Sequence, residues 1–524
     1  MKTFTNPFVL LVLVVVAVMA QSGAPAAQTY TPPRTADGQP DLQGVWKANT
    51  RAAYNLLEHQ ASHGMPAGAS VVDGNAIPYQ PWAAAKQKEN FANRATADPL
   101  GKCFKPGVPR ITYLDFPFQI FQTPKYVAIL YEWTQTYRVI PLDGSAHWDD
   151  IDFWMGDSRG RWEGNTLVVE VINHNDETWF DMSGNFHSDA LRVIERYTRV
   201  GPDAIRYEAT IEDEKVFTRP WKMSMTLSRE AGGRLLEYQC QAEAEEARGE
   251  FVPAPTWYGQ PVPSTGYVPR PYAASLPAHT SVRITPTFPR AADGKPDLTG
   301  SYNGNGMPAS WGLQDHAPKF GFPGGKSILV DPPNQLLPMQ AWTRLEHEKR
   351  LLDEFAHQDP TARCFVAGVP RSMYVLGGLL QILQPPGYIV MLFERWSWRI
   401  IPLDGRPHLP EHVRLWMGDS VGRWDGDTLV VDTTNTNGKS WLNEIGEVIS
   451  HSAHIVERFT MADASKIEYE VTVDDPLAYT APWTIAVAFT KSNREAELME
   501  QACHEGNQAV KLMQGAAEKA RQAR

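Results

Sequence analysis

The chain has 524 residues, of which 43% are hydrophobic and 21% charged, and its formal net charge at pH 7 is −11. These values are typical of a globular protein and exclude collagen, coiled-coil and disordered chains. The acidic balance disfavours nucleic-acid binding, because nucleic-acid-binding proteins neutralise phosphates with a basic surface. A chain of this length is expected to form more than one domain.

Residues 1–20 predict a secretory signal peptide. Lys2 supplies a positive charge before an apolar run from Phe8 to Ala20, and Val18-Met19-Ala20 resembles a small-x-small cleavage site. The run has 13 residues, which is too short to span a hydrocarbon core about 30 Å thick. A signal anchor that stays attached is the alternative. We therefore expect a periplasmic or secreted protein with no membrane span in the mature chain.

Most of the remaining chain repeats one plan twice. The matched segments are 33–42 with 289–298, 103–110 with 364–371, 138–144 with 399–405, and 154–169 with 416–431. Such self-similarity indicates a tandem duplication. It predicts a first copy over residues 21–250, a second copy over 289–508, and a C-terminal helical tail over 509–524. The Pro-rich residues 251–288 between the copies predict a stiff linker.

Each copy is expected to begin with a helix and continue as β-strands. Helical patterns cover residues 81–95 in the first copy and 339–357 in the second. Apolar and polar residues then alternate with a period of two, which is typical of strands with one buried face. In the first copy, the predicted strands are 117–123, 125–132, 136–141, 165–172, 190–199, 204–212, 220–228 and 234–240. These patterns predict a mainly β protein with two tandem antiparallel, lipocalin-like barrels, and β-sandwiches are the alternative.

The four cysteines lie at matching positions of the two copies. Export places the protein in an oxidising compartment, where cysteines form disulfides. Four cysteines allow three pairings, and the duplication favours one bond within each copy, Cys103–Cys240 and Cys364–Cys503. No Cys-x-x-Cys or histidine-rich spacing accompanies them, so we expect no metal site.

One carboxylate in each copy lies on the apolar face of a predicted strand. Glu195 alternates with Val193 and Tyr197, and Glu457 has the matching place in the second copy. An inward carboxylate needs a cation, a hydrogen bond or a proton. The candidate partners on other strands are Arg138, Tyr207, Arg399 and Tyr469. One interpretation is a structural Glu–Arg pair, and the other is an acid or base that faces a ligand.

Residues 156–160 and 418–422 both match the G-x-S-x-G pattern. In hydrolases with a nucleophile elbow, a strand precedes this pattern and a helix follows it. Here the pattern leads into a turn and a strand. We therefore interpret the segment as turn chemistry, in which Gly and Asp or Ser stabilise the backbone, rather than as a nucleophile.

Histidines distinguish the two copies. His174 and His187 of the first copy are replaced by Thr436 and Ile449 in the second. We therefore predict that any catalysis occurs chiefly in the first copy. The candidate catalytic residues are Glu195, His187, Tyr207, His147 and Asp157, and the candidate ligand-binding residues are Arg138, Glu132, Glu457, Tyr469 and Arg399.

The motifs at residues 37–44, 154–162 and 426–432 define a resemblance. The sequences Asp-Gly-x-Pro-Asp-Leu-x-Gly, Trp-Met-Gly-Asp-Ser-x-Gly-Arg-Trp and Gly-Asp-Thr-Leu-Val-Val-Asp resemble those of a large set of uncharacterised exported bacterial proteins. The resemblance spans nearly the whole mature chain and implies export but no particular activity. The first copy departs from the pattern at Asn165 and the second at Ile449, so we expect the two copies to differ in function.

Two classes of function remain open on the sequence. One is an exported protein that binds a small hydrophobic or aromatic molecule in a barrel pocket. The other is an enzyme, such as a hydratase, isomerase or hydrolase, that applies acid–base chemistry to such a molecule. A carbohydrate-active hydrolase, which would use paired carboxylates, is a third hypothesis. We expect a small-molecule ligand and no cofactor or nucleic acid, and the sequence leaves the oligomeric state open.

Overall fold

The computed structural model describes residues 30–62, 64–230, 232–253, 287–304, 307–374, 378–395, 397–492 and 498–522. The predicted signal peptide and most of the predicted linker lie outside these residues. Within the described ranges, no helix is both long and apolar enough to cross a membrane.

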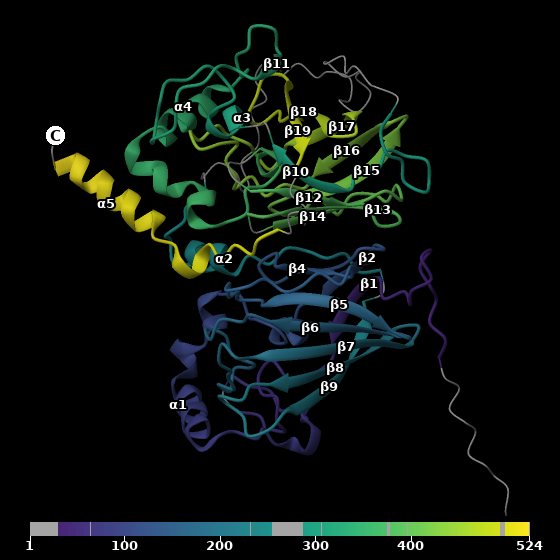
Figure 1. Cartoon of the computed structure of the whole chain (residues 1–524). Helices are drawn as coiled ribbons and strands as arrows, with labels where there is room; N and C mark the ends of the chain where they lie inside the picture. The colour runs from purple at the N-terminus through teal and green to yellow at the C-terminus, as the bar shows by residue number, and fades with distance from the viewer. Residues whose placement is uncertain are drawn as a thin grey trace, which may run out of the picture.

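The first copy forms a nine-stranded antiparallel sheet that curls into a nearly closed barrel (Figure 1). Its strands follow the order β4-β3-β2-β1-β9-β8-β7-β6-β5. The bounds are β1 (Gly44–Ala48), β2 (Phe118–Gln122), β3 (Tyr126–Tyr131), β4 (Tyr137–Pro141), β5 (Asp157–Glu163), β6 (Thr166–Ile172), β7 (Arg192–Gly201), β8 (Ala204–Glu212) and β9 (Trp221–Arg229).

The second copy repeats this topology in the order β14-β13-β12-β10-β19-β18-β17-β16-β15, with β11 paired to β19. Both predicted barrels are therefore confirmed, and the sandwich alternative is wrong. The bounds are β10 (Gly300–Gly304), β11 (Leu329–Asp331), β12 (Leu380–Leu383), β13 (Tyr388–Phe393), β14 (Ser397–Pro402), β15 (Asp419–Asp425), β16 (Thr428–Thr434), β17 (His454–Asp463), β18 (Lys466–Asp474) and β19 (Trp483–Lys491).

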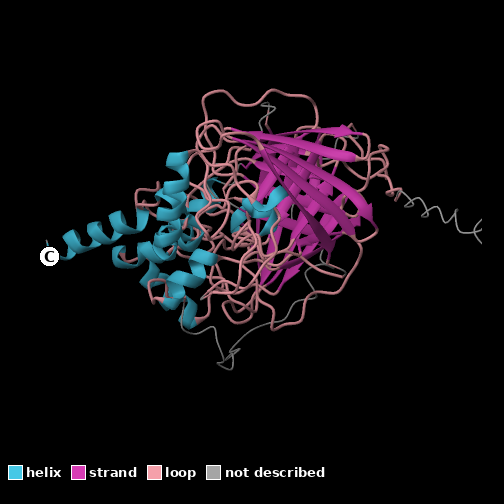
Figure 2. Cartoon of the chain, turned by 90° about the horizontal axis from the view of Figure 1, so that it is seen from below, coloured by secondary structure: helices cyan, strands magenta, loops and turns pink. Residues whose placement is uncertain are grey.

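Most of the helical segments lie on one side of the sheets (Figure 2). The α-helices are α1 (Pro81–Ala97), α2 (Cys240–Ala247), α3 (Met307–Trp311), α4 (Ala341–Arg350) and α5 (Ala509–Gln522). The first predicted helix corresponds to α1. The second predicted helix, over residues 339–357, is shorter than expected. It ends near Leu352, which has an extended backbone, and a 3-10 turn over Asp353–Gln358 follows.

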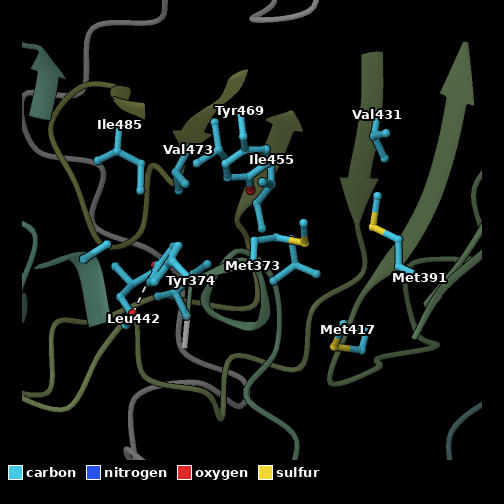
Figure 3. Packing of buried hydrophobic residues seen from close by; sticks show 14 of the residues in the cluster. Met373, Tyr374, Met391, Met417, Val431, Leu442, Ile455, Tyr469, Val473 and Ile485 are labelled. Atoms are coloured by element: carbon cyan, nitrogen blue, oxygen red, sulfur yellow. Dashed lines mark hydrogen bonds between the residues drawn. The ribbon is translucent and has the colours of Figure 1, made fainter. Parts of the chain in front are cut away.

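Alternating side chains fill the interior of each barrel. In β8, Ile205, Tyr207, Ala209 and Ile211 are all buried, as the period-two pattern predicts. Figure 3 shows the matching interior of the second barrel, where Ile455, Tyr469 and Val473 lie close to Met373. The barrel interiors are therefore packed cores rather than wide lumens.

Each sheet has a seam where the barrel does not close. In the first barrel, β4 and β5 lie at opposite ends of the strand order and do not pair, and β14 and β15 are placed in the same way in the second. Strand β5 was not predicted, because its glycine-containing sequence Asp-Ser-Arg-Gly-Arg does not alternate cleanly. Strand β1 was also missed. We refer to the β4–β5 gap as the seam of the first barrel.

The two barrels pack against each other through the outer faces of β2–β4 and β12–β14 (Figure 1). Phe121, Leu130, Leu392 and Trp398 belong to the apolar cluster at this contact. Two equivalent hydrogen bonds cross this contact in opposite directions. The Tyr137 hydroxyl donates to the Phe393 carbonyl at 3.0 Å, and Trp398 Nε1 donates to the Tyr131 carbonyl at 3.2 Å. Because these residues are equivalent in the two copies, the contact has approximate two-fold symmetry.

Each copy also extends a segment over the other copy. We call residues 234–239 and 498–501 the exchanged arms. In one arm, Glu237 accepts hydrogen bonds from the backbone N–H groups of Trp416 and Met417. In the other, Glu500 accepts from Trp154 and Met155 in the same way. The predicted strand over 234–240 is wrong, because the segment forms only an isolated bridge between Tyr238 and Trp133. Its backbone N–H groups at Leu236 and Tyr238 donate to Glu132 of its own copy, while the Glu237 side chain bonds across the interface.

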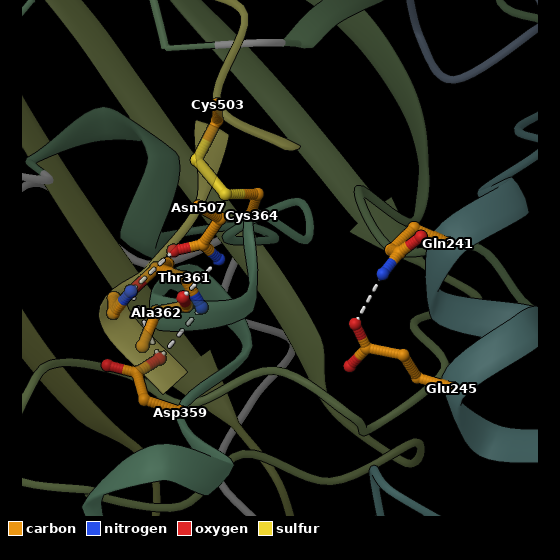
Figure 4. Close-up of a disulfide and its surroundings, with 9 residues drawn as sticks. Gln241, Glu245, Asp359, Thr361, Ala362, Cys364, Cys503 and Asn507 are labelled. Carbon is orange, nitrogen blue, oxygen red and sulfur yellow. Dashed lines mark hydrogen bonds between the residues drawn. A yellow bond between two sulfur atoms is a disulfide. The ribbon is translucent and has the colours of Figure 1, made fainter. Parts of the chain in front are cut away.

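The disulfides lie beside the arms and confirm the predicted pairing. Cys103 bonds to Cys240 and Cys364 bonds to Cys503, across sequence separations of 137 and 139 residues. Figure 4 shows the second bond next to the contact in which Asn507 donates to the Ala362 carbonyl at 2.9 Å. The arm over 234–239 is thus fixed to its own copy at both ends, by β9 on one side and by the disulfide on the other.

We expect the Cys103→Ser, Cys240→Ser double variant to lose about 4–5 kcal/mol of unfolding free energy, because the bond restrains a long loop of the unfolded chain. Urea denaturation of oxidised protein measures this loss. Faster hydrogen exchange at the Met417 amide should accompany it, because the arm that binds this amide loses an anchor. Unchanged stability and unchanged exchange would contradict the role of the bond as an arm anchor.

Candidate functional site

A cavity of about 100 Å³ lies at the seam of the first barrel. One wall comes from β4 and another from β5, and the exchanged arm of the second copy covers the outside. The lining residues include Thr136, Tyr137, Arg138, Val139, Trp148, Phe153, Met155, Gly156, Asp157, Ser158, Glu394, Leu498, Met499, Glu500 and Gln501. The cavity is therefore built from both copies.

Arg138 reaches across the seam from β4. Its Nη2 donates to Glu195 Oε2 at 2.6 Å and to Ser158 Oγ on β5 at 2.9 Å, and its Nη1 lies 3.3 Å from Glu195 Oε1. Although burial lowers the pKa of Arg138, the Glu195 carboxylate raises it well above its ordinary value. The guanidinium therefore stays charged and ties the two edges of the seam to β7.

Glu195 faces the packed interior of the barrel. Its Oε1 accepts the hydroxyls of Tyr197 at 2.9 Å and Tyr207 at 3.0 Å, in addition to Arg138. Burial and the Glu195 charge raise the pKa of both tyrosines well above its usual value, so both remain protonated donors. Glu195 is fully buried, and Arg138, rather than Glu195, lines the cavity. The geometry is that of a buried ion pair in which both carboxylate oxygens of Glu195 accept hydrogen bonds.

The second barrel contains the same pair. Arg399 contacts both carboxylate oxygens of Glu457, and its Nε donates to Ser420 Oγ at 3.0 Å. Its Nη2 also donates to Thr433 Oγ1 at 2.8 Å. Tyr469 donates to Glu457 Oε1 at 2.9 Å, so the candidate residues Glu457, Tyr469 and Arg399 form one buried cluster.

His147 contacts Asp157, which is the first residue of β5. The Nδ1 atom of His147 lies 2.9 Å from Asp157 Oδ2, which also accepts from the backbone of Trp148 at 2.9 Å. Arg159 Nη1 donates to the other oxygen at 2.6 Å. Asp157 thus fixes the loop between β4 and β5, and its side chain borders the cavity.

The matching His408 takes part in a wider network. Its Nδ1 contacts Asp419 at 3.0 Å, and its Nε2 contacts Asp432 at 3.2 Å. His454 contacts the same Asp432 oxygen at 2.8 Å. The hydrogen bonds to Asp419 and Asp432 raise the pKa of His408 to about 9. This histidine is therefore a cation at neutral pH.

Ser158 lies inside β5 rather than in a turn, so the turn interpretation applies only to Gly156, which has φ of +66°. Its hydroxyl accepts a hydrogen bond from Arg138. Within the described part of the chain, no hydrogen bond joins Ser158 to a histidine. The arrangement lacks the base that would activate a serine nucleophile.

His187 and His174 lie together in the first barrel, with ring centroids 5.7 Å apart. His187 Nε2 contacts Thr178 Oγ1 at 2.6 Å, and its Nδ1 contacts the Ser188 carbonyl at 2.9 Å. Burial lowers the pKa of both histidines, and the shift of His174 is the larger. Both rings are therefore neutral, and His187 is held by two contacts within its own copy.

Glu132 holds an exchanged arm. Its Oε2 accepts the backbone N–H of Leu236 at 3.1 Å, and burial raises the pKa of its carboxyl group. The equivalent Glu394 accepts from Met499 at 3.2 Å in the opposite arm and lines the cavity. The sequence analysis did not predict that Glu132 would bind an arm. The partner is a backbone N–H group, which every residue except proline carries, so the sequence holds no signal for it.

No cluster of three or more histidine, cysteine, aspartate or glutamate side chains suited to a metal ion occurs in the described ranges. The cavity instead combines aromatic walls with charged and hydroxyl groups. Its chemistry therefore suits the binding of a small organic molecule.

Comparisons with known proteins add little to this geometry. The chain matches no family model and no curated protein. Among solved structures, a Bacteroides ovatus protein titled Xyloglucan PUL GH43B aligns at 10% identity over 74% of this chain and 97% of that chain, with a TM-score of 0.09. A score this low supports no inference about fold or function.

Replacing Glu195 by Gln should reduce the unfolding free energy by about 3–5 kcal/mol, because it leaves the buried Arg138 charge without its counter-ion. Chemical denaturation measures the loss. Glu457→Gln is the matched variant in the second barrel and should cost a similar amount. A neutral effect of Glu195→Gln would contradict the assignment of a structural ion pair.

The raised pKa of His408 gives a testable pH dependence. The folded-state pKa of about 9 lies above the usual value of 6.5, so protonation stabilises the fold fully below pH 6.5, and this contribution is lost as the pH rises through 9. An NMR titration of the His408 ring should give a midpoint near 9. Asp432→Asn should lower that midpoint, and an unchanged midpoint would contradict the proposed cause.

Proposed function

We propose that this protein is an exported binding protein for a small amphipathic molecule, which it holds in the cavity at the seam of the first barrel. The observation that supports this proposal is the position of the cavity. Because β4 and β5 do not pair there, a ligand reaches Arg138 and Ser158 without entering the packed interior. Two disulfides fit an oxidising compartment outside the cytoplasm.

The walls of the cavity fit a ligand with an apolar body and a polar group. Tyr137, Trp148 and Phe153 supply aromatic surface, while Arg138 and Ser158 converge from opposite edges of the seam. The walls are about equally polar and apolar, which matches a ligand that carries both kinds of surface. The volume of about 100 Å³ limits the ligand to a very small molecule unless the arm of the second copy moves.

The second copy contributes the outer wall. Leu498 and Met499 line the cavity, and Glu500 fixes their arm by accepting the N–H groups of Trp154 and Met155. Movement of this arm is the simplest route for ligand entry. The duplication thus supplies one barrel that holds the ligand and another that covers it.

Binding is favoured over acid–base catalysis by the orientation of Glu195. Its two oxygens accept hydrogen bonds from Arg138, Tyr197 and Tyr207 within the core. A general acid or base must reach the reacting atom by hydrogen bond or through one water. Arg138 stands between this carboxylate and the cavity as its hydrogen-bonded partner.

Native mass spectrometry of the protein, produced with its disulfides formed, tests the proposal. We expect a small co-purifying molecule, which Ser158→Val should release by removing a hydroxyl from the cavity wall. Ser420→Val is the matched control, because Ser420 makes the same type of contact with Arg399 in the second barrel. Equal retention in both variants would contradict the site. The absence of any ligand, together with no thermal shift from benzyl alcohol or cyclohexanol, would overturn the proposed function.

A further inference from the structure

A second and larger cavity lies where the end of the first copy meets helix α4 of the second copy, and we call it the α4 cavity. Its volume is about 380 Å³, which falls in the range of about 300–1,000 Å³ that is typical of small-molecule sites. Its walls come from residues 251–253 after α2, from α4 with the 3-10 turn that follows it, and from the loop after β16. The α4 cavity shares no lining residue with the seam cavity.

Aromatic side chains form the apolar part of the wall. Phe251 and Trp441 are 2% and 4% exposed, and Phe355 is half-buried. The Phe251 ring packs edge-on against Phe365, with the ring centroids 5.1 Å apart. These neighbours hold the rings in place, so the wall offers a preformed surface to a flat apolar molecule.

Arg350 brings an unused hydrogen-bond donor to the α4 cavity. Its Nε donates to Glu346 Oε1 at 3.0 Å, and its Nη1 contacts the Gly446 carbonyl at 3.4 Å. The guanidinium lies over the Trp441 ring, with Cζ 4.8 Å from the ring centroid. The Nη2 atom donates no hydrogen bond to the described residues, although the side chain is only 5% exposed. Because Arg350 lines the cavity, this donor is available to a ligand there.

Cations outnumber carboxylates in the cavity wall. Lys349, Arg350 and Lys439 all line it, whereas Glu346 is the one carboxylate among the described residues that do. Glu346 contacts both Arg350 and Lys349, at 3.0 and 3.5 Å. Lys439 contacts Glu246 of α2 at 2.5 Å, outside the wall. The wall therefore favours an anion, while Glu346 opposes a second negative charge on the same ligand.

The first copy shows that the fold does not require these cations. The equivalent positions there are neutral or acidic: Asn90 corresponds to Arg350, Glu89 to Lys349 and Glu177 to Lys439. Two glycines support this match, because a Cβ added to Gly184 would lie 2.6 Å from Asn90 Cβ, and one added to Gly446 would lie 2.6 Å from Arg350 Cβ. Trp441 keeps its aromatic counterpart in Trp179. The second copy has thus replaced neutral and acidic side chains by basic ones around a shared tryptophan.

We propose that the α4 cavity binds a small aromatic monocarboxylate, whose carboxylate pairs with Arg350 in the field of Lys349 and Lys439 and whose rings lie against Phe251, Phe355 and Trp441. A guanidinium fits a carboxylate because its N–H groups match the carboxylate oxygens in spacing and charge. This site goes beyond the proposed function of the seam cavity, since the two cavities are built from different residues.

Calorimetric titration of the oxidised full-length protein with four probes tests the ligand class. We expect 2-naphthoate to bind at least about tenfold more tightly than 2-naphthylmethanol, acetate or 2-naphthyl phosphate, because only 2-naphthoate combines one negative charge with an aromatic body. Equal binding of 2-naphthylmethanol would show that the cations contribute nothing, and equal binding of acetate would show the same for the rings. Tighter binding of 2-naphthyl phosphate would overturn the preference for a single charge.

A charge reversal toward the first copy tests the residues. Lys439→Glu should weaken 2-naphthoate binding about tenfold, because it places a carboxylate in the wall. Lys326→Glu is the matched control, since Lys326 also belongs to the second copy and also forms an ion pair, with Asp315 at 2.7 Å, but lies outside the cavity. This control should leave binding unchanged. An equal loss in both variants would mean that net charge alone attracts the probe, and it would overturn the site.

A gain of affinity tests the site without depending on a damaging substitution. Glu246→Gln frees Lys439 from its ion pair and should tighten 2-naphthoate binding about threefold, because the carboxylate that competes with the ligand is gone. Glu243 of the same helix acts on Lys439 only at longer range. Asp315→Asn removes the partner of Lys326 and should have no effect. Weaker or unchanged binding in Glu246→Gln would contradict a role for Lys439.

The remaining outcomes concern the position of the ligand. A crystal structure with 2-naphthoate should place its carboxylate beside Arg350 Nη2, and a molecule bound elsewhere would overturn the site. If none of the four probes binds, the α4 site is overturned as well. Neither result bears on the ligand that co-purifies in the seam cavity, so the two proposals fail separately.

Discussion

The unclosed seam between β4 and β5 is the constraint on which the rest of the structure depends. A strand edge that is left unpaired exposes backbone donors and acceptors and must be covered or paired. Here the edges of the first barrel are covered by a side chain on the inside and by a chain segment on the outside. Arg138 joins both edges to Glu195 from the inside, and the arm of the opposite copy lies over the outside. The cavity lies between Arg138 and the arm over 498–501. Its position therefore follows from the gap between β4 and β5.

The ion pair with glutamate explains why arginine occupies this position in both copies. A planar guanidinium can contact both oxygens of one carboxylate and still donate to a hydroxyl on another strand. Arg138 and Arg399 use this geometry in the same way, whereas their surroundings differ. In the second copy Met373 and Phe393 replace Thr112 and Tyr131, and Thr433, which accepts a hydrogen bond from Arg399, replaces Val171. The shared ion pair maintains the fold, and the surroundings are where the two copies have diverged.

Much of the fold could be predicted from the sequence, because repetition and period-two alternation are properties of the chain itself. The inward position of Glu195 and its candidate partner Arg138 followed from the same alternation. Strand β5 did not, because glycines interrupt its pattern. The sequence of residues 234–239 resembles that of a strand, but the Glu237 side chain bonds to the backbone of the second copy. A local sequence pattern cannot predict a partner that lies so far along the chain.

The exchanged arms have a consequence for the history of the chain. Each arm leaves its own barrel, satisfies the backbone of the other and returns to a disulfide in its own copy, and the two exchanges are equivalent. Such reciprocity is the property of an isologous contact between identical subunits. Joining the genes of a symmetric homodimer end to end would give this arrangement. Joining removes the requirement that both halves keep the same sequence, so each half can acquire a recognition site that the other lacks.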